Sequence, residues 1–518
     1  MKRDVSTSTQ KNAPNRRTFI GLLAGLLLFF CTLLAVAQHT SNATTAVTNP
    51  DLVLHGVAHG SQNHSYVEVP FQVPHGVERV TVKFTYTDRE KHTALDLGML
   101  DPTQLRCWAG GNKAVLTVGL SDATPSCLPG PIPTGEWNVL IGIPNIRPAV
   151  TSHYTIDVYF TRTGLVAAEP SILREPLRSG PAWYRGDLHM HTAHSDGQCL
   201  NQTGQKVPCP VFFTVDAAAK RGLDFIAITD HNATSQYDAM RELQPYFDKV
   251  LLIPGREITT FYGHMNFLGT TDFIDFRVGS KTVPDLNTLL RCANKLGAVV
   301  SINHPDAPTG ELCMGCGWTP PSSVDMHLFQ AVEAVNGGSE MYGISGVPFW
   351  DKQLDRGLRM AGIGGSDNHN AFTPSSQFSS VGSPTTVVFA SDLSTPAILA
   401  GIRAGHVFID LTGSRDRMLE ATAKTGEAVA HMGDVLETKK GVAVTFDIHV
   451  MGVKDGKVAL LEDGQAMPST ASPAATIDQN FKYSWTADGQ RHWFRPQVSG
   501  PDGKLWLLGN PMYVDWRK

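Results

Sequence analysis

The alternation of hydrophobic and polar residues divides the chain into three regions with different expected structures. From residue 49 to about 165, apolar and polar residues alternate in short runs such as SYVEVPFQV and ERVTVKFTYT, which Gly/Pro clusters separate. This period-two pattern is typical of strands that bury one face. We therefore predict a β-sandwich or jelly-roll module over residues 38–165.

The pattern changes in the middle of the chain. Runs such as LDFIAITDHN and AVVSINHPD are typical of buried strands, and DAMRELQPYFDK and LNTLLRCANKLG are typical of helices. Strands that alternate with helices indicate βαβ units in a parallel sheet, and about seven units fit here, which suits a small barrel. The sequence therefore predicts an α/β barrel domain over residues 181–412. Strand patterns return after it and predict a small C-terminal β module over 413–518.

The first 37 residues have the pattern of an export signal. Two arginines in NRRTFI precede a largely apolar run over 19–37, which ends in the small-residue pattern AVA. This is typical of a signal peptide over 1–37 with its cleavage site, and NRRTFI resembles a twin-arginine signal. The alternative is an uncleaved membrane anchor, because the run approaches spanning length. We expect an exported protein, periplasmic or extracellular, that contacts the membrane only through this segment if it stays uncleaved.

Composition and charge narrow the classes of function. Hydrophobic residues make up 42% of the chain and charged residues 18%, which is ordinary for a globular protein. The formal net charge of −5 does not indicate the positive surface charge that nucleic-acid binding requires, so we expect a small-molecule substrate. Outside the cytosol, neighbouring cysteines can form disulfides. The local pairs are Cys107 with Cys127, Cys199 with Cys209, and Cys313 with Cys316.

Histidines and carboxylates gather where the predicted strands of the middle region end. The candidate metal ligands are His189, His191, Asp196, His231, Glu257, His264, His304, Asp367 and His369. In a barrel the carboxyl ends of all strands meet on one face, so these side chains are expected to converge. Imidazole and carboxylate together suit zinc, manganese or iron, and groups buried together without cations would repel one another. The sequence therefore predicts a site for two to three divalent metal ions.

The motifs that carry these residues resemble those of a known family. GDLHMHTAHSDG, ITDHN, GREIT with GHMN, NHP and GSDNH are similar to the motifs of the PHP-domain superfamily of metal-dependent hydrolases (polymerase and histidinol phosphatase-like). They resemble most the branch with nucleotide phosphatases and carbaryl-hydrolase-like enzymes. The resemblance covers about residues 181–412 and implies a distorted (β/α)7 barrel.

The resemblance also implies how the ligands are shared between metal ions. His189, His191, Glu257 and Asp367 would hold the first ion. Glu257, His264 and His304 would hold the second. Asp196, His231 and His369 would hold a third.

The expected activity is metal-dependent hydrolysis by a metal-activated water at a di- or trinuclear site. The candidate catalytic residues are His231, His369 and Asp367, and either histidine could protonate the leaving group if no metal holds it. The leading hypothesis is a phosphoesterase. The alternatives are a hydrolase of carboxylic or carbamic esters that uses the same metals, and a binding module without catalysis. The chain has no GxSxG, Walker A or GxGxxG motif.

Four residues beside the candidate ligands have two interpretations each. Asp187 and Asp230 either orient the imidazoles of metal-bound histidines or are plain polar residues at strand ends. Arg185 and Arg256 either contact the substrate or, as we favour, form salt bridges in the wall of the site. Glu333 and Asn336 end another predicted strand and are expected at the same face, in a role that the sequence does not define.

Overall fold

The computed structural model describes residues 49–111, 113–162, 175–309, 315–340, 345–468 and 472–516. Among the described residues, strands hold 44% and helices 14%, so this part of the chain is built mainly from β-sheets. The predicted signal segment and Cys313 lie outside the described residues. None of the described helices is both long enough and apolar enough to cross a membrane.

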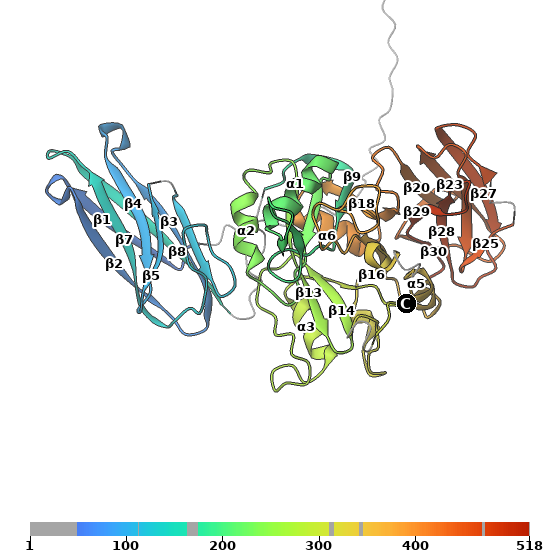
Figure 1. Cartoon of the computed structure of the whole chain (residues 1–518), viewed down its shortest axis with the longest axis horizontal. Helices are drawn as coiled ribbons and strands as arrows, with labels where there is room; N and C mark the ends of the chain where they lie inside the picture. Colours follow the sequence, from blue (N-terminus) through green and yellow to red (C-terminus); the bar gives the residue numbers. More distant parts are fainter. Residues whose placement is uncertain are drawn as a thin grey trace, which may run out of the picture. The chain divides into compact units, whose positions relative to one another are not determined.

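The first described region forms two antiparallel sheets of four strands each, in the orders β1-β8-β3-β6 and β2-β7-β4-β5 (Figure 1). The strands are β1 (Leu52–His59), β2 (Ser65–Val73), β3 (Val77–Tyr86), β4 (Ala94–Leu100), β5 (Leu105–Gly110), β6 (Val115–Gly119), β7 (Gly135–Asn145) and β8 (Thr151–Arg162). Alternation along β7 turns Trp137, Val139 and Ile141 inward, and all three are fully buried. One apolar core fills the space between the two sheets.

A disulfide joins Cys107 in β5 to Cys127, which confirms the first expected cysteine pair. Cys199 and Cys209 are free thiols in this structure, and so is the exposed Cys292. Replacing Cys107 and Cys127 together by serine is expected to lower the free energy of unfolding of this region by about 3 kcal/mol, because the open chain gains entropy. The midpoint of thermal unfolding measures this effect. The control variant Cys292→Ser should have the same midpoint as wild type. Equal midpoints for the double variant and wild type would contradict the expectation.

The middle region contains a mixed sheet that carries most of the predicted site. The strands of the middle region are β9 (Ser179–Asp187), β10 (Gln198–Leu200), β11 (Lys206–Pro208), β12 (Phe225–Ile228), β13 (Leu251–Thr260), β14 (Gly263–Leu268), β15 (Val299–Ile302), β16 (Ala331–Asn336), β17 (Ala361–Gly365), β18 (Thr385–Asp392) and β19 (Val407–Asp410). Its helices are α1 (Val211–Arg221), α2 (Gln236–Leu243), α3 (Leu286–Lys295), α4 (Gly337–Glu340), α5 (Val347–Asp355) and α6 (Thr395–Ala404). Short 3-10 turns lie at Gly60–Gln62, Arg89–Lys91 and Met326–Leu328.

The predicted (β/α)7 barrel is wrong, because this sheet is mixed and its strand ladder does not close. The path runs β17-β16-β15-β14-β13-β12-β9-β18-β19 and then on into later strands. Antiparallel pairs at β13–β14, β14–β15, β9–β18 and β18–β19 interrupt the parallel ones. Where β17 meets β18, the Thr386 hydroxyl bonds both the N–H and the C=O of Gly364, in place of a backbone ladder. The chain is therefore not a helix-rich α/β barrel.

Two helices show how the sequence fixes the elements that cover this sheet. Asp285 caps α3 by accepting a hydrogen bond from the Thr288 N–H at 2.7 Å. Leu286, Leu289 and Leu290 then recur at helical spacing and are buried. A side-chain cap also begins α6, where the Ser394 hydroxyl accepts a hydrogen bond from the Ala397 N–H.

The last region consists of strands that continue the same sheet and add a second one. These strands are β20 (Met418–Thr425), β21 (Ala428–His431), β22 (Val435–Leu436), β23 (Ala443–Met451), β24 (Lys457–Glu462), β25 (Gln465–Ala466), β26 (Ser472–Pro473), β27 (Asp478–Thr486), β28 (His492–Ser499), β29 (Leu505–Gly509) and β30 (Met512–Val514). β29 pairs antiparallel with β19, so backbone hydrogen bonds run directly from the middle region into this one. The domain boundaries at 165, 181 and 412 stay predictions.

Candidate metal centre

The centre begins at the end of β9, where the chain continues as Leu188-His189-Met190-His191. Period-two alternation sends the side chains of Leu188 and Met190 into the apolar core and the two histidines to the opposite side. His189 and His191 are buried, and their Nε2 atoms lie 3.1 Å apart. Two imidazole nitrogens this close can contact one ion.

Glu257 of β13 supplies the carboxylate around which the histidines gather. Its side chain is buried, and each of its oxygens faces more than one ring nitrogen. The histidines with a ring nitrogen within 3.4 Å of a Glu257 oxygen are His189, His191, His231, His264 and His304. A carboxylate in such a position can bridge two metal ions.

Asp367 adds a second carboxylate to the same histidine pair. It follows β17, and its Oδ1 lies 3.4 Å from His189 Nε2 and 3.2 Å from His191 Nε2. Its backbone is in the left-handed region, with φ of 53°, and its N–H donates to the carbonyl of His189 at 2.9 Å. Non-glycine residues held in this strained conformation cluster at functional sites.

The third predicted set lies at the open end of the centre. Asp196 Oδ1 is 3.3 Å from His369 Nε2, and Asp196 Oδ2 is 3.9 Å from His231 Nε2. The side chains of Asp196, His369 and His231 are 55%, 40% and 27% exposed, whereas each of the other six candidate ligands is at most 18% exposed. This end of the cluster therefore faces the solvent.

The structure brings all nine predicted ligands into one continuous cluster of four overlapping groups that could each hold an ion. The groups are His191, Asp196, His231 and His369; His189, Glu257 and His304; His189, His191 and Asp367; and His231, Glu257 and His264. They differ from the expected sets in several respects: His264 groups with His231 and not with His304, His304 groups with His189, and His191 joins Asp196, His231 and His369. The role of each residue as a metal ligand stays a prediction.

The residues present fit divalent metal ions. His264 is buried, and neither of its ring nitrogens forms a hydrogen bond with good geometry among the described residues, although Nδ1 lies 3.2 Å from Glu257 Oε1. A buried polar group without a partner is costly, and metal coordination at a ring nitrogen would remove that cost. The donor set of imidazole nitrogens and carboxylate oxygens is the one that zinc, manganese and iron accept.

The carboxylates and histidines of the centre shift the pKa values of one another, so that protons are held on histidine when metal is absent. Burial alone would raise the pKa of Glu257, but His189 and the other histidines outweigh it and hold the pKa well below its usual range. Burial alone would lower the pKa of His189, yet Glu333, Glu257 and Asp367 raise it well above its ordinary value. Metal binding must displace such protons, so metal affinity is expected to decrease as the pH is lowered.

The metal-free protein is expected to lose stability as the pH rises above about 6.5. Burial lowers the pKa of His369, but Asp196 and Asp367 outweigh it and raise the pKa to about 9. A group whose pKa is higher in the folded state stabilises it below the unfolded pKa, and this contribution is lost as the pH rises through the folded pKa. Thermal unfolding in chelator at pH values from about 6 to about 10 measures the effect. In His369→Gln the unfolding midpoint should decrease less steeply with rising pH than in wild type. A wild-type midpoint that rises over this range would overturn the expectation.

Glu333 of β16 orients two candidate ligands at once. Its buried carboxylate accepts from His189 Nδ1 at 2.7 Å through Oε1, and from the His304 N–H at 3.0 Å and Asn336 Nδ2 at 2.9 Å through Oε2. Because Nδ1 donates to Glu333, Nε2 of His189 is left to face the centre. Only glycine fits at Gly365, since a Cβ there would lie 2.4 Å from Glu333 Oε1.

Among the described residues, neither Asp187 nor Asp230 accepts a hydrogen bond directly from an imidazole; Asp230 reaches the His191 ring only through the Ser195 hydroxyl. Asp187 accepts from the backbone N–H groups of His189, Ser366 and Gly382. Asp230 accepts from Thr192 and from the Ser195 hydroxyl. Both therefore fix the backbone that carries the ligands.

Arg185 forms a salt bridge in the wall, as favoured from the sequence, whereas Arg256 forms no salt bridge among the described residues. Arg185 bonds to Asp410 at 3.2 Å, and Arg256 donates to the carbonyl of Ile274 at 3.0 Å. His194, the third histidine of the first motif, bonds to the Ser235 hydroxyl at 2.7 Å and is not in any of the four groups.

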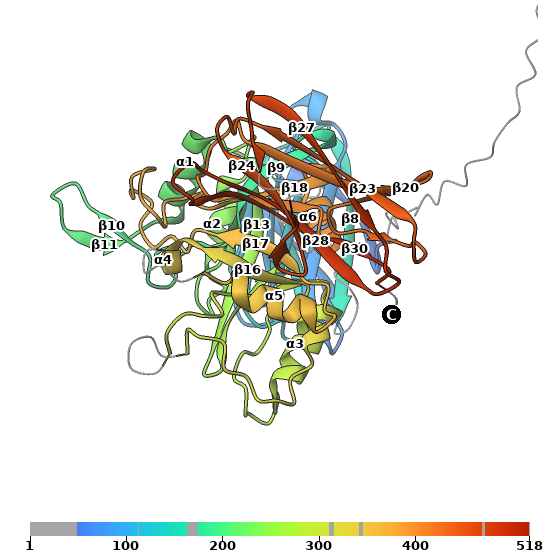
Figure 2. The same ribbon diagram turned by 90° about the vertical axis from the view of Figure 1, so that its right-hand side faces the viewer.

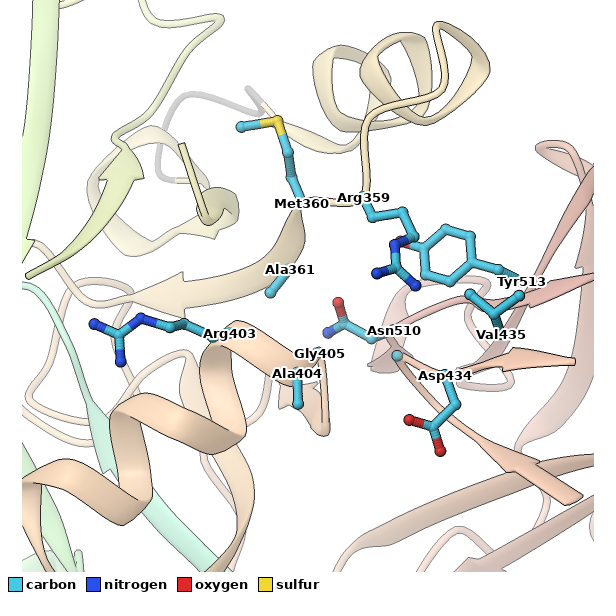
Figure 3. A pocket seen from close by; sticks show the side chains of 11 residues that line it. Arg359, Met360, Ala361, Arg403, Ala404, Gly405, Asp434, Val435, Asn510 and Tyr513 are labelled. Atoms are coloured by element: carbon cyan, nitrogen blue, oxygen red, sulfur yellow. The ribbon is translucent and has the colours of Figure 1, made fainter. Parts of the chain in front are cut away.

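A separate cavity of about 290 Å³ lies between β17, α6 and the strands of the last region (Figure 3). Arg359 and Arg403 are exposed at its edge, and Asn510 forms part of its wall. The Asn510 amide already bonds to Gly362 and to the Val407 carbonyl, so it holds strands together. None of the nine candidate ligands lines this cavity, which is therefore distinct from the metal centre.

No family model matches the chain, and no curated protein matches it. Among solved structures, the chain is similar to a two-domain protein from Bacteroides vulgatus described as containing a predicted PHP-like metal-dependent phosphoesterase. The two share 18% sequence identity with a TM-score of 0.36, over 67% of this chain and 98% of that one. The function proposed for this chain rests on the geometry of the nine-residue cluster.

Proposed function

We propose that the chain is a metal-dependent hydrolase of small phosphoesters. The single observation that supports this most is the Glu257 carboxylate with five histidine nitrogens within 3.4 Å. So many imidazoles around one buried carboxylate suit two or three divalent ions, of zinc, manganese or iron. When bound, such ions would lower the pKa of water and offset the charge that develops on the ester in the transition state.

The chain's own residues divide the remaining work. Glu257 and Asp367 supply the negative charge that balances the cations, and Glu333 holds the His189 ring in one orientation. His231 and His369 are the most exposed histidines of the cluster, so either can give a proton to the leaving group at the open end. These acid–base roles are part of the proposal.

We also infer membership of the PHP superfamily from the five motifs, whose ligand residues all lie in the one cluster. Export is proposed from the twin-arginine-like NRRTFI segment. The Cys107–Cys127 disulfide supports it, because disulfides persist mainly in oxidising compartments.

The test compares substrates on the purified chain after loading with Mn²⁺ or Zn²⁺. We expect p-nitrophenyl phosphate to be hydrolysed, and a chelator to abolish turnover until metal is returned, because the metal ions would supply the activated water. Naphthyl esters serve as the competing substrate class. Turnover of naphthyl esters alone would contradict the phosphoesterase proposal and favour an ester hydrolase, while phosphatase turnover that survives metal removal would contradict the metal mechanism.

A further inference from the structure

The β10–β11 hairpin borders the open end of the metal centre. The Gln198 N–H at its start donates to the carbonyl of His369 at 2.7 Å, which ties the hairpin to the centre. A cavity of about 210 Å³ lies between them. Its lining includes Gln198, Leu200 and Lys206 of the hairpin and Asp196, His369 and Asn370 beside the centre. Figure 2 shows the hairpin projecting outward beside α1 and α4.

The hairpin presents one of its faces to this cavity. Leu200 lies directly opposite Lys206 in the antiparallel register, so both side chains are on the same side. Gln198 precedes Leu200 by two residues and shares that side. Cys199 and Cys209 are buried in a small apolar cluster with Ala371, which anchors the hairpin, and Cys199 also lines the cavity. The placement of Lys206 at the cavity is thus built into the strand register.

Lys206 brings a positive charge that is not neutralised within the protein. Its side chain is exposed, and no carboxylate of the described part of the chain lies within ion-pair distance of it. Arg185, by contrast, is paired with Asp410 at 3.2 Å. A cation beside the most exposed ligands will favour a negatively charged substrate group there.

The size of the cavity limits what that group can be. Sites for drug-sized ligands usually measure about 300–1,000 Å³, and this cavity is smaller. It suits a compact group such as a phosphoryl group. A phosphate monoester carries a charge of about −1.5 to −2 near neutral pH, whereas a carboxylic ester carries none.

We propose that this cavity is the subsite for the phosphoryl group of a small phosphate monoester, with Lys206 as its cationic contact. This rests on the proposed phosphoesterase function and goes beyond it, because it assigns a substrate class and a residue that discriminates phosphate from neutral esters. Lys206 is a specificity-determining residue and not a metal ligand.

The test titrates inorganic phosphate into the Mn²⁺-loaded full chain by calorimetry and measures turnover of p-nitrophenyl phosphate and naphthyl acetate. Lys206→Met removes the charge, Lys206→Arg keeps it, and Lys220→Met on α1 is the matched control, since Lys220 pairs with Asp216 at 2.6 Å. In Lys206→Met we expect the phosphate Kd and the phosphoester KM to rise about tenfold, with kcat and metal content nearly unchanged. Lys206→Arg and Lys220→Met should resemble wild type.

The outcomes separate this inference from the function on which it rests. If wild type hydrolyses p-nitrophenyl phosphate and Lys206→Met has the same KM and phosphate Kd, the subsite is wrong and the phosphoesterase function stands. If wild type hydrolyses only naphthyl acetate, the phosphoesterase function is wrong. In that case the phosphate titration still judges the subsite, and phosphate binding that is absent or independent of Lys206 would overturn it.

Discussion

Replacing Glu257 with glutamine is expected to remove the bound metal ions and to lower turnover by about 1,000-fold or more. Glutamine keeps the shape of the side chain and loses its charge. Glu257 belongs to two of the four groups of candidate ligands, and five histidines approach its oxygens. Without its charge the histidines would share a buried site with too little compensation for bound cations.

Metal content by elemental analysis and turnover of p-nitrophenyl phosphate measure this effect. Glu242→Gln on α2 is the control, because Glu242 is an exposed glutamate outside the cluster. Its metal content and turnover should equal those of wild type. A folded Glu257→Gln protein that keeps both its metal and its turnover would remove Glu257 from the centre.

The second large effect is expected from Glu333→Gln, which should weaken metal affinity by about 10- to 100-fold. The amide oxygen of glutamine can still accept from His189 Nδ1. Its NH₂ group, however, would face two other donors, the His304 N–H and Asn336 Nδ2, where a carboxylate oxygen now accepts from both. The rings of His189 and His304 would then lose their fixed orientation.

A metal titration distinguishes this positioning role from ligation. Excess metal should restore the turnover of Glu333→Gln, because its ligands are intact, whereas it should not restore that of Glu257→Gln. Reduced turnover of Glu333→Gln with unchanged metal affinity would show that Glu333 does not act through the ligands.

The site was more predictable from the sequence than the fold. Six of the candidate ligands closely follow the end of a strand that an apolar run reveals, as His189 follows β9 and Asp367 follows β17. Such positions can be read without knowing how the strands pair. The grouping of His264 could not be read, because it depends on where the β13–β14 hairpin places the ring relative to His231 and His304.

The barrel prediction failed for a related reason. Apolar runs show that a strand is buried, and they do not show whether its neighbour is parallel. The GHMNFL segment, for example, is β14, the returning arm of an antiparallel hairpin with β13. Likewise, β18 pairs antiparallel with both β9 and β19, and β19 continues into β29. Pairing of this kind is set by long-range contacts that period and composition do not encode.

The roles of the buried acids were also beyond the sequence. Asp187 ends β9 and Glu333 lies within β16, yet Asp187 accepts from backbone amides while Glu333 also accepts from an imidazole. Which donor a carboxylate meets depends on side-chain packing within an ångström or so. Glu333 could have been suspected from its place at the end of FQAVEAVNG, but not its partner.

The most direct test of the metal centre is a titration of the metal-stripped full chain with Zn²⁺ or Mn²⁺, followed by calorimetry and by turnover of p-nitrophenyl phosphate in the same samples. The nine-residue cluster predicts two to three ions bound per chain, with turnover that rises in step with their binding. Stripped protein that turns over substrate at the full rate, or that binds no divalent metal while it stays folded, would contradict it.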